Sequence, residues 1–277
     1  MNIIDCAGRP LDLRRTAVMG ILNVTPDSFS DGGLFFSRDR AVKRGLELVE
    51  GGADIVDVGG ESTRPGAEAV STQEELDRVI PVIEALRDAV SVPISVDTLK
   101  PAVMREAVSA GAGMINDVQA LRADGALQTA AELKVPVCLM HMQGEPRTMQ
   151  DNPHYEDVIA EVREFLRARR QACLDAGLDA AKVIVDPGFG FGKTVEHNLT
   201  LLRHLGEFKS LGAPILAGLS RKSIIGKVLN LPTEQRLHAS VALAVLAAQN
   251  GANIVRLHDV RATCEAIRMV EAVYRAA

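Results

Sequence analysis

Short apolar runs rich in β-branched residues alternate along the chain with longer segments that have helical spacing. Eight such runs can be counted, and each has a length typical of a buried strand. They span residues 18–23, 54–59, 93–97, 114–116, 136–140, 182–186, 215–219 and 253–257. Segments with helical periodicity between them include 40–50, 72–89, 101–110 and 155–176. The pattern predicts eight repeats of a strand followed by a helix.

Strict alternation of strand and helix predicts a parallel sheet, and mostly apolar strands indicate that both faces of the sheet are covered. Eight such units close naturally into a (β/α)8 TIM barrel, an α/β fold. No Pro/Ser-rich linker, low-complexity tract or charge block divides the 277 residues, so we expect one domain over 1–277. A doubly wound open sheet is the alternative fold. We interpret residues 34–39 as a connector.

Polar residues follow every one of the eight strand candidates. In a TIM barrel, ligands bind at the carboxyl ends of the strands. A single Asp, Asn or Ser at such an end could simply cap the next helix, but Arg and Lys are poor caps. Polar residues at all eight ends therefore favour a shared pocket. They are Asn23, Glu61, Ser62, Thr63, Arg64, Asp97, Asn116, Asp117, His141, Asp186, Ser220, Arg221, Lys222, Arg256 and His258.

The expected pocket has two chemical halves. Asp97, Asn116 and Asp186 suit the N–H edge of a neutral heterocycle. A cationic half suits phosphate oxygens, which a planar guanidinium can bind in pairs. It consists of Arg64, Arg256, His258 and, as a further candidate, Lys222. The implied ligand is a base-like ring that carries an anion.

Several other site types are excluded. The stretch GFGFGKT at 188–194 resembles a nucleotide P-loop, but that spacing requires glycine where the chain has Pro187. We interpret it as a flexible loop whose Phe189 and Phe191 are free to wall an aromatic ligand; Phe191 could instead pack on the outer helix. No G-x-S-x-G elbow or H-x-x-x-H pair occurs, which argues against a serine hydrolase and a zinc site. A magnesium ion held by one oxygen ligand and diphosphate would leave little trace.

Composition narrows the partners and the compartment. A net charge of -5 argues weakly against nucleic acid as the main partner. The four cysteines are scattered, which indicates a reduced cytoplasmic protein. The N-terminus lacks the apolar stretch of a signal peptide, and the most apolar run, 240–248, is far shorter than the roughly 20 residues needed to span a bilayer. We expect a soluble protein without a membrane partner.

Seven segments resemble the dihydropteroate synthase family, in order and at barrel strand ends. They are MGILNVTPDSFSDGG (19–33), DVGGESTRPGA (57–67), SVDT, IND, DPGFGFGKT, GLSRKS and RLHDV. The resemblance implies a transferase that joins a pterin-methyl diphosphate to 4-aminobenzoate and releases diphosphate. It also implies Mg²⁺, a homodimer, a cytoplasmic location and a sulfonamide target. In this family the C–O bond is thought to ionise before the amine attacks.

The resemblance also assigns roles to residues. The catalytic set is Asp97, Lys222, Arg256 and His258. The pterin is held by Asp97, Asn116, Asp186 and Lys222, with Met140 and Gly218 lining the slot. Diphosphate is met by Asn23, Arg64, Arg256 and His258, and Mg²⁺ bridges Asn23 and the phosphates. The aminobenzoate lies between Pro65, Phe191 and Lys222, with its carboxylate near Ser223 and with Thr63 between the subsites.

Two loops are expected to close over the site, 23–33 and 61–66. Their mobile residues are Phe29, Asp31 and Ser62, although Phe29 could instead anchor a static turn. Two rival functions share the pterin half of the pocket. One is a methyltetrahydrofolate-dependent methyltransferase barrel, and the other is a non-catalytic pterin-binding protein.

Overall fold

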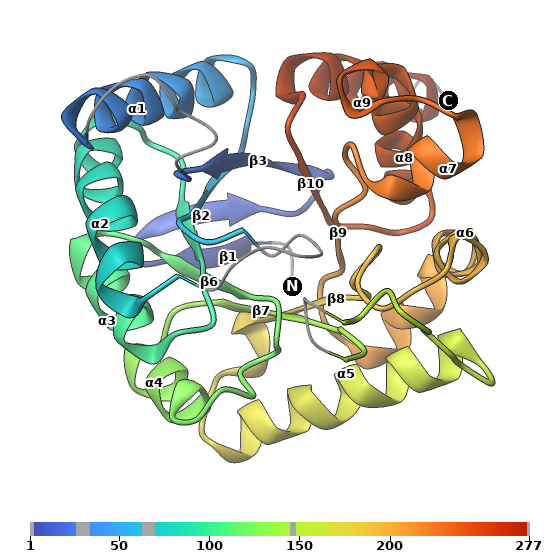
Figure 1. The fold of residues 1–277 in the computed structure, drawn as a ribbon, viewed down its shortest axis with the longest axis horizontal. Helices are drawn as coiled ribbons and strands as arrows, with labels where there is room; N and C mark the ends of the chain where they lie inside the picture. Colours follow the sequence, from blue (N-terminus) through green and yellow to red (C-terminus); the bar gives the residue numbers. More distant parts are fainter. Residues whose placement is uncertain (1–2, 26–33, 63–69, 145–147, 276–277) are drawn as a thin grey trace.

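Eight parallel strands form a closed ring at the centre of the molecule (Figure 1). The structure is a computed structural model that describes residues 3–25, 34–62, 70–144 and 148–275. The ring strands are β3 (Ala17–Asn23), β4 (Ile55–Gly59), β5 (Ile94–Asp97), β6 (Met114–Asp117), β7 (Val137–Met140), β8 (Val183–Asp186), β9 (Leu216–Ala217) and β10 (Ile254–Leu257).

Strand pairing confirms the TIM barrel. Each strand from β3 to β7 pairs in parallel with the strand that follows it in the chain, and β10 lies between β9 and β3. A parallel bridge between Val185 and Ile215 joins β8 to the residue before β9 and completes the ring. All eight strand predictions are confirmed, and the alternative of an open doubly wound sheet is wrong.

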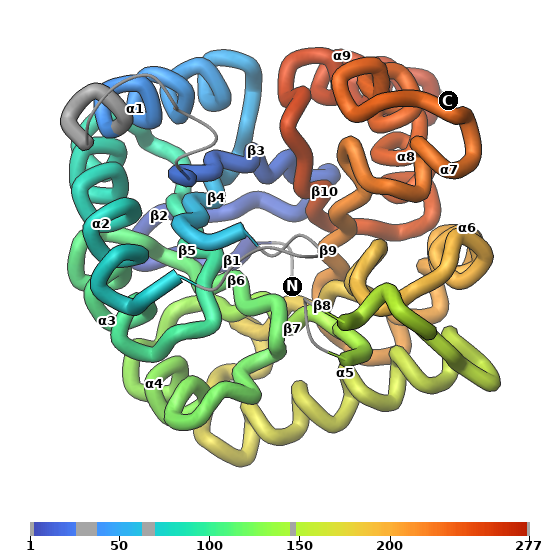
Figure 2. Tube along the Cα trace, viewed as in Figure 1, coloured from blue at the N-terminus to red at the C-terminus, as the bar shows by residue number. Residues whose placement is uncertain are grey.

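Helices surround the ring (Figure 2). An apolar layer lies between strands and helices. Local signals fix where they begin: Ser71 Oγ accepts a hydrogen bond from Glu74 N, and Asp157 accepts from two amides of its helix. No helix in the described part of the chain is long and apolar enough to cross a membrane. The helices are α1 (Leu34–Glu50), α2 (Thr72–Ala89), α3 (Pro101–Ala110), α4 (Ala126–Leu133), α5 (Val158–Asp175), α6 (Val195–Arg203), α7 (Ser223–Leu229), α8 (Leu237–Gln249) and α9 (Val260–Arg275).

The first helix is longer than the sequence pattern predicts. Residues 34–39 belong to α1, so their interpretation as a connector is wrong. The polar Ser37–Arg38–Asp39 run resembles a helix start, but no proline interrupts 34–50, and the helix continues through it.

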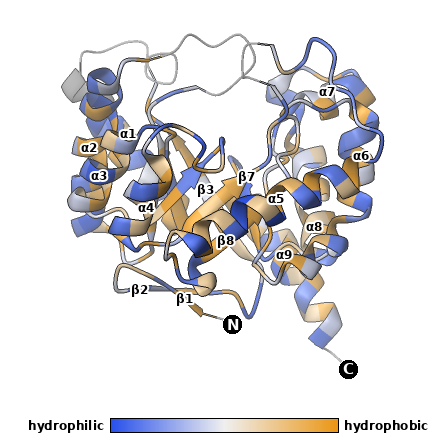
Figure 3. Ribbon diagram, turned by 90° about the horizontal axis from the view of Figure 1, so that it is seen from below, coloured by the Kyte–Doolittle hydropathy of each residue, from blue (hydrophilic) through white to orange (hydrophobic). Residues whose placement is uncertain are grey.

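An N-terminal hairpin closes the bottom of the barrel and was not predicted. Strands β1 (Ile3–Cys6) and β2 (Arg9–Asp12) pair in antiparallel fashion through Ala7 and Gly8, whose φ values of 53° and 85° suit a two-residue hairpin turn. The hairpin buries Ile4, Cys6 and Leu11 against the barrel interior. Figure 3 shows it at the end opposite α7. Ligands can therefore enter only from the other end of this barrel.

All four cysteines are free and buried. They are Cys6, Cys138, Cys173 and Cys264.

Candidate active site

The pocket floor follows from the two-residue periodicity of the strands. A lower interior layer is apolar and includes Met19, Ile55, Met114, Cys138, Ile184, Leu216 and Ile254. Because successive side chains alternate between faces, residues two positions later point into the same interior, one layer higher. These residues are Ile21, Asp57, Asn116, Met140, Asp186, Gly218 and Arg256, and β5 adds Asp97. Polar groups thus converge directly above an apolar plug.

Arg256 is the hub of this floor. Its Nε lies 2.6 Å from Asp57 Oδ2 and its Nη2 lies 2.6 Å from Asp97 Oδ2. Asn116 Nδ2 donates to the same Asp57 oxygen over 3.1 Å. The guanidinium therefore joins the two halves of the pocket that the sequence separated. Asp57 was missed, although an aspartate inside the apolar strand IVDVG, two residues after Ile55, was a usable signal.

Lys222 faces this hub from the far side of the pocket. Its Nζ donates to the carbonyl of Phe189 and lies 4.6 Å from the centre of the Phe191 ring. A side chain at Gly218 would come within about 4 Å of both Lys222 Nζ and Arg256 Cβ, so glycine leaves a slot between the two cations.

Burial shifts the pKa values of the floor in opposite directions. It raises the pKa of Asp97 to about 7, although Arg256 opposes the shift. It also raises the pKa of Asp186, opposed chiefly by Lys222. Burial lowers the pKa of Lys222 to about 8, opposed by Asp186. The floor consequently contains an acid and a base that both titrate near neutral pH.

These shifts predict a bell-shaped pH profile of kcat/KM. We expect a ring to be bound by the carboxylate form of Asp97, so activity should fall as pH drops below about 7. We expect the ammonium form of Lys222 to be needed as well, so activity should fall again as pH rises above about 8. Steady-state kinetics between pH 5.5 and 9.5 measure both limbs, and Asp97→Asn should abolish the acid limb. A flat profile through pH 7 in the wild-type protein would contradict this assignment.

Side-chain hydrogen bonds and one ion pair shape the upper rim of the pocket. His258 Nδ1 and Ser220 Oγ lie 3.0 Å apart. Arg221 forms a two-pronged ion pair with Asp259 over 2.6 and 3.0 Å. Arg236 Nη1 donates to the Arg221 carbonyl over 3.0 Å. Since Arg236 comes from the start of α8, far from any strand end, strand-end reasoning could not find it.

The pocket above the floor has a volume of about 530 Å³ and brings most of the predicted residues together. Asn116, Met140 and Asp186 are almost fully buried at the strand ends beneath it. Thr63, Arg64, Pro65, Phe29 and Asp31 lie outside the described residues. Predicted residues on the pocket wall are Asn23, Glu61, Ser62, Asp97, Phe191, Gly218, Ser220, Arg221, Lys222, Ser223, Arg256 and His258. Unpredicted ones are Ile21, Thr25, Met149, Gly190, Thr233 and Arg236.

The glycine-rich stretch after β8 is a packed wall, and one expectation about it is wrong. Phe189 is fully buried in the layer between strands and helices, so it cannot wall a ligand. Phe191 is half-buried and lines the pocket, as its site interpretation requires. Lys193, which a P-loop would aim at phosphate, instead has its amine in the interior. The rejection of a P-loop is therefore consistent with the structure.

The residues present fit a magnesium ion that arrives with a phosphate ligand. Asn23 ends β3 and lines the pocket, where its carboxamide oxygen is a hard donor. No group of three His, Cys, Asp or Glu side chains in the described ranges could hold a metal alone. Asn23 would thus contribute an oxygen ligand, and diphosphate and water would complete the coordination of the ion.

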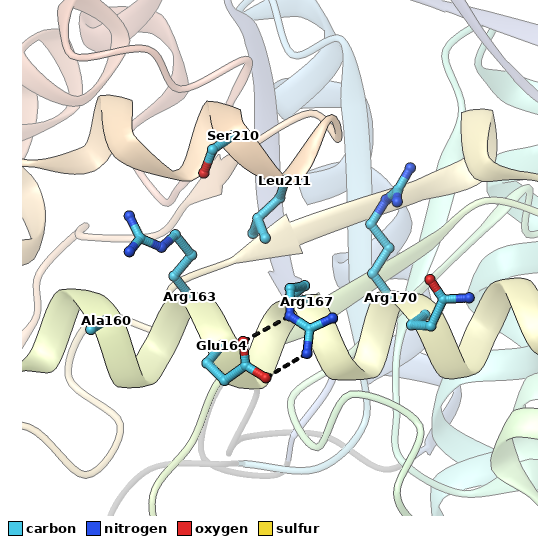
Figure 4. Close-up of a pocket in the computed structure, with 8 residues that line it drawn as sticks. Ala160, Arg163, Glu164, Arg167, Arg170, Ser210 and Leu211 are labelled. Atoms are coloured by element: carbon cyan, nitrogen blue, oxygen red, sulfur yellow. Dashed lines mark hydrogen bonds and ion pairs between the residues drawn. The ribbon is translucent and has the colours of Figure 1, made fainter.

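A second hollow lies on the outer helical layer, away from the strand ends. Figure 4 shows Arg163, Arg167 and Arg170 along α5 there. Arg167 binds Glu164 through two hydrogen bonds of 2.6 and 2.7 Å. No floor residue lines this hollow, so the strand-end pocket is the candidate active site.

The fold and the pocket define a TIM-barrel protein with a ligand pocket at the carboxyl ends of its strands, where acceptor and cationic groups meet. The pterin binding enzyme family matches residues 19–258, and the chain belongs to that family. It is 54% identical to dihydropteroate synthase of Haemophilus influenzae, over 96% of this chain and 97% of the relative.

Two solved structures support the same grouping. Dihydropteroate synthase of Xanthomonas albilineans with 4-aminobenzoic acid is 56% identical, with a TM-score of 0.94, and the match covers 100% of this chain and 99% of that one. The same enzyme in complex with 7,8-dihydropteroate is 54% identical, with a TM-score of 0.91 and 99% coverage of both chains. The chain is accordingly a transferase of the dihydropteroate synthase type.

Proposed function

We propose that this chain condenses (7,8-dihydropterin-6-yl)methyl diphosphate with 4-aminobenzoate to form 7,8-dihydropteroate and diphosphate. One observation carries the proposal: the Asp57–Arg256–Asp97 hub places a hydrogen-bonding floor directly beneath a rim of cationic groups. Relatives with 4-aminobenzoic acid or 7,8-dihydropteroate bound support the choice of substrates.

The floor binds the pterin and favours positive charge on it. Asp97, Asn116 and Asp186 present oxygen atoms to the N–H edge of the ring, and Lys222 donates to a ring acceptor. The carboxylate of Asp97 stabilises the cationic character that develops as the C–O bond breaks. Met140 lies at the apolar base of the slot, where it contacts the ring face.

The rim holds the leaving group. Arg256 and His258 meet the diphosphate oxygens, together with Arg64. Mg²⁺, held by Asn23 and diphosphate, would neutralise charge on the departing oxygens. Because the cations already lie in the low-dielectric pocket, little reorganisation accompanies the break. No strong general base is needed.

The second substrate enters beside the loop after β8. Phe191 and Lys222 flank the aminobenzoate ring, with Pro65 on the other side and Thr63 between the subsites. Its carboxylate lies at Ser223, the first residue of α7, where free N–H groups favour an anion. Residues Phe29, Asp31 and Ser62 belong to the two loops proposed to exclude water from the reactive cation.

A product-identification assay with alternative substrates tests this function. The chain should form dihydropteroate from the two proposed substrates and should not transfer a methyl group from methyltetrahydrofolate to a thiol acceptor. Dihydropteroate is measured by chromatography with absorbance detection. Methyl transfer without condensation would instead support the methyltransferase alternative, and pterin binding with neither reaction would support a non-catalytic role.

Magnesium should bind together with diphosphate and only weakly alone. One carboxamide ligand gives little affinity for a strongly hydrated ion, so calorimetry with Mg²⁺ alone should show no binding tighter than about 1 mM. Diphosphate should bind more tightly with Mg²⁺ than with EDTA present, and Asn23→Ala should remove most of that difference. Micromolar Mg²⁺ affinity in the absence of diphosphate would contradict a shared site.

The proposal includes a cytoplasmic homodimer. Alanine-rich α8 packs against α9, and the two helices expose Leu246, Met269, Val273 and Tyr274. We expect light scattering to give twice the chain mass of 29.7 kDa. Leu246→Glu should yield a monomer, whereas Ile3→Glu, at an exposed position on the hairpin, should not. A monomeric wild-type protein at micromolar concentration would contradict the dimer.

A further inference from the structure

Lys193 is almost completely buried, with 2% of its surface exposed, and it does not line the pocket. Its Nζ lies 2.9 Å from the carbonyl oxygen of Gly188 and 3.0 Å from that of Phe191. It also lies 2.9 Å from Nδ1 of His141, the residue that follows β7. One amine thus joins two points of the loop after β8 to the end of the neighbouring strand.

The backbone of this loop is tightly turned and packed. Gly188, Gly190 and Gly192 all have left-handed φ values, between 61° and 81°. A Cβ at Gly188 would lie 1.9 Å from the His141 carbonyl oxygen, so only glycine permits this approach. The loop is pressed backbone to backbone against the chain after β7. Inside the loop, the Gly188 carbonyl accepts a hydrogen bond from Phe191 N over 3.2 Å. Lys193 adds a buried donor to this carbonyl and to the carbonyl of Phe191.

The same short loop presents two groups to the pocket. The carbonyl of Phe189 accepts a hydrogen bond from Lys222, and the Phe191 ring lies beneath the Lys222 amine. Lys193 donates to the carbonyl of Phe191 itself and to that of Gly188, the residue before Phe189. It therefore binds the backbone that carries both contacts.

The hydrogen bond between Lys193 and His141 suits a structural role. Burial lowers the pKa of Lys193 well below its ordinary value, opposed by Asp186. Burial, followed by the neighbouring Lys193, lowers the pKa of His141 to about 2. The imidazole thus stays neutral at working pH, and the two nitrogen atoms share one hydrogen bond.

We propose that Lys193 is a positioning residue that fixes the 188–192 loop, and with it Phe191 and Lys222, through the Gly188, Phe191 and His141 contacts. The proposal deepens the proposed function, since it makes Lys193 set the geometry of the aminobenzoate side of the pocket. Lys193 itself touches neither substrate.

Lys193→Met tests the proposal because it keeps the length of the side chain and removes the donor. We expect the KM for aminobenzoate to rise about tenfold while kcat falls less than threefold, because the misplaced wall weakens binding of that substrate. The matched control is Lys182→Met, which removes a lysine that donates to the Lys134 carbonyl over 2.6 Å on the outer surface. The control should leave both constants unchanged.

A readout that needs no turnover separates this proposal from the proposed function. With 4-fluorophenylalanine incorporated, the Phe191 resonance, assigned by its loss in Phe191→Leu, should be sharp in the wild-type protein. In Lys193→Met it should broaden or split. This spectrum tests whether Lys193 fixes the 188–192 loop even if no condensation is detected. A wild-type resonance together with a wild-type KM would overturn the proposal.

Two substitutions of His141, the hydrogen-bond partner of Lys193, test the proposal if Lys193→Met does not fold. His141→Asn keeps an acceptor oxygen close to the position of Nδ1, and His141→Leu removes it. We expect His141→Asn to retain a sharp Phe191 resonance and a KM within about threefold of wild type, and His141→Leu to show the broadened resonance and raised KM. Indistinguishable behaviour of the two variants would overturn the proposal.

Discussion

Replacing Arg256 with alanine is expected to lower kcat/KM by about three orders of magnitude, a size typical of removing a preorganised charge from a transition state. The guanidinium does two things at once. It holds Asp57 and Asp97 in place over 2.6 Å contacts. In the proposed function it also meets the diphosphate as charge develops there. Loss of Arg256 therefore removes stabilisation of the leaving group and disorders the floor beneath the ring.

A second variant separates the two effects of Arg256. Arg256→Lys keeps one positive charge but cannot bind two carboxylates in a fixed fork, so we expect an intermediate loss of about 100-fold. Urea unfolding of each variant shows how much of the loss reflects the fold. His258→Gln removes the imidazole, the candidate for a general base. We expect kcat/KM to fall about tenfold, the effect of one weakened hydrogen bond to diphosphate. Equal losses in Arg256→Ala and His258→Gln would contradict leaving-group electrostatics.

Lys100→Met is expected to give the largest loss of stability, about 3–5 kcal/mol, the range measured when one partner of a buried ion pair is removed. Lys100 Nζ lies 2.5 Å from Glu75, whose side chain is fully buried, and 2.6 Å from Glu61. Burial alone would lower the pKa of Lys100, but the hydrogen bonds to Glu61 and Glu75 raise it, so the ammonium persists. Without it, the Glu75 carboxylate is left in the interior with no opposite charge.

Two controls show whether the loss comes from the orphaned charge. Lys100→Met/Glu75→Gln replaces the buried carboxylate with a neutral amide and should recover at least half of the lost stability. Arg167→Met breaks the exposed pair with Glu164 on α5 and should cost less than about 1 kcal/mol. Urea unfolding at pH 7 measures all three. A Lys100→Met variant as stable as Arg167→Met would contradict the account of this pair.

The barrel was predictable because its strands are buried on both faces and leave an unambiguous apolar signature. The polar residues at strand ends were predictable for the same reason, since each breaks that signature at a fixed place. Asp57 lies inside a strand, and finding it required the two-residue step from Ile55 in the lower layer. The hairpin 3–12 was missed because its strands are four residues each and one of them contains Pro10.

Side-chain direction within loops could not be predicted from the sequence. Phe189 and Phe191 occupy equivalent places in GFGFGKT, yet one is fully buried in the core and the other lines the pocket. Gly188, Gly190 and Gly192 in this stretch have left-handed φ values, and Gly188 and Gly192 lie against the chain after β7. Such tertiary contacts cannot be read from the local pattern. Arg236 reaches the pocket rim from a helix start, again through tertiary packing and not through local pattern.

Diphosphate release and dihydropteroate formation, measured together, test the proposed condensation most directly. The protein is incubated with the pterin-methyl diphosphate and Mg²⁺, with and without 4-aminobenzoate, and both products are quantified. We expect equal amounts of the two products when the amine is present, and almost none of either from the Arg256→Ala variant. Pterin binding without condensation, or an Arg256→Ala variant with near wild-type turnover, would contradict the proposed function.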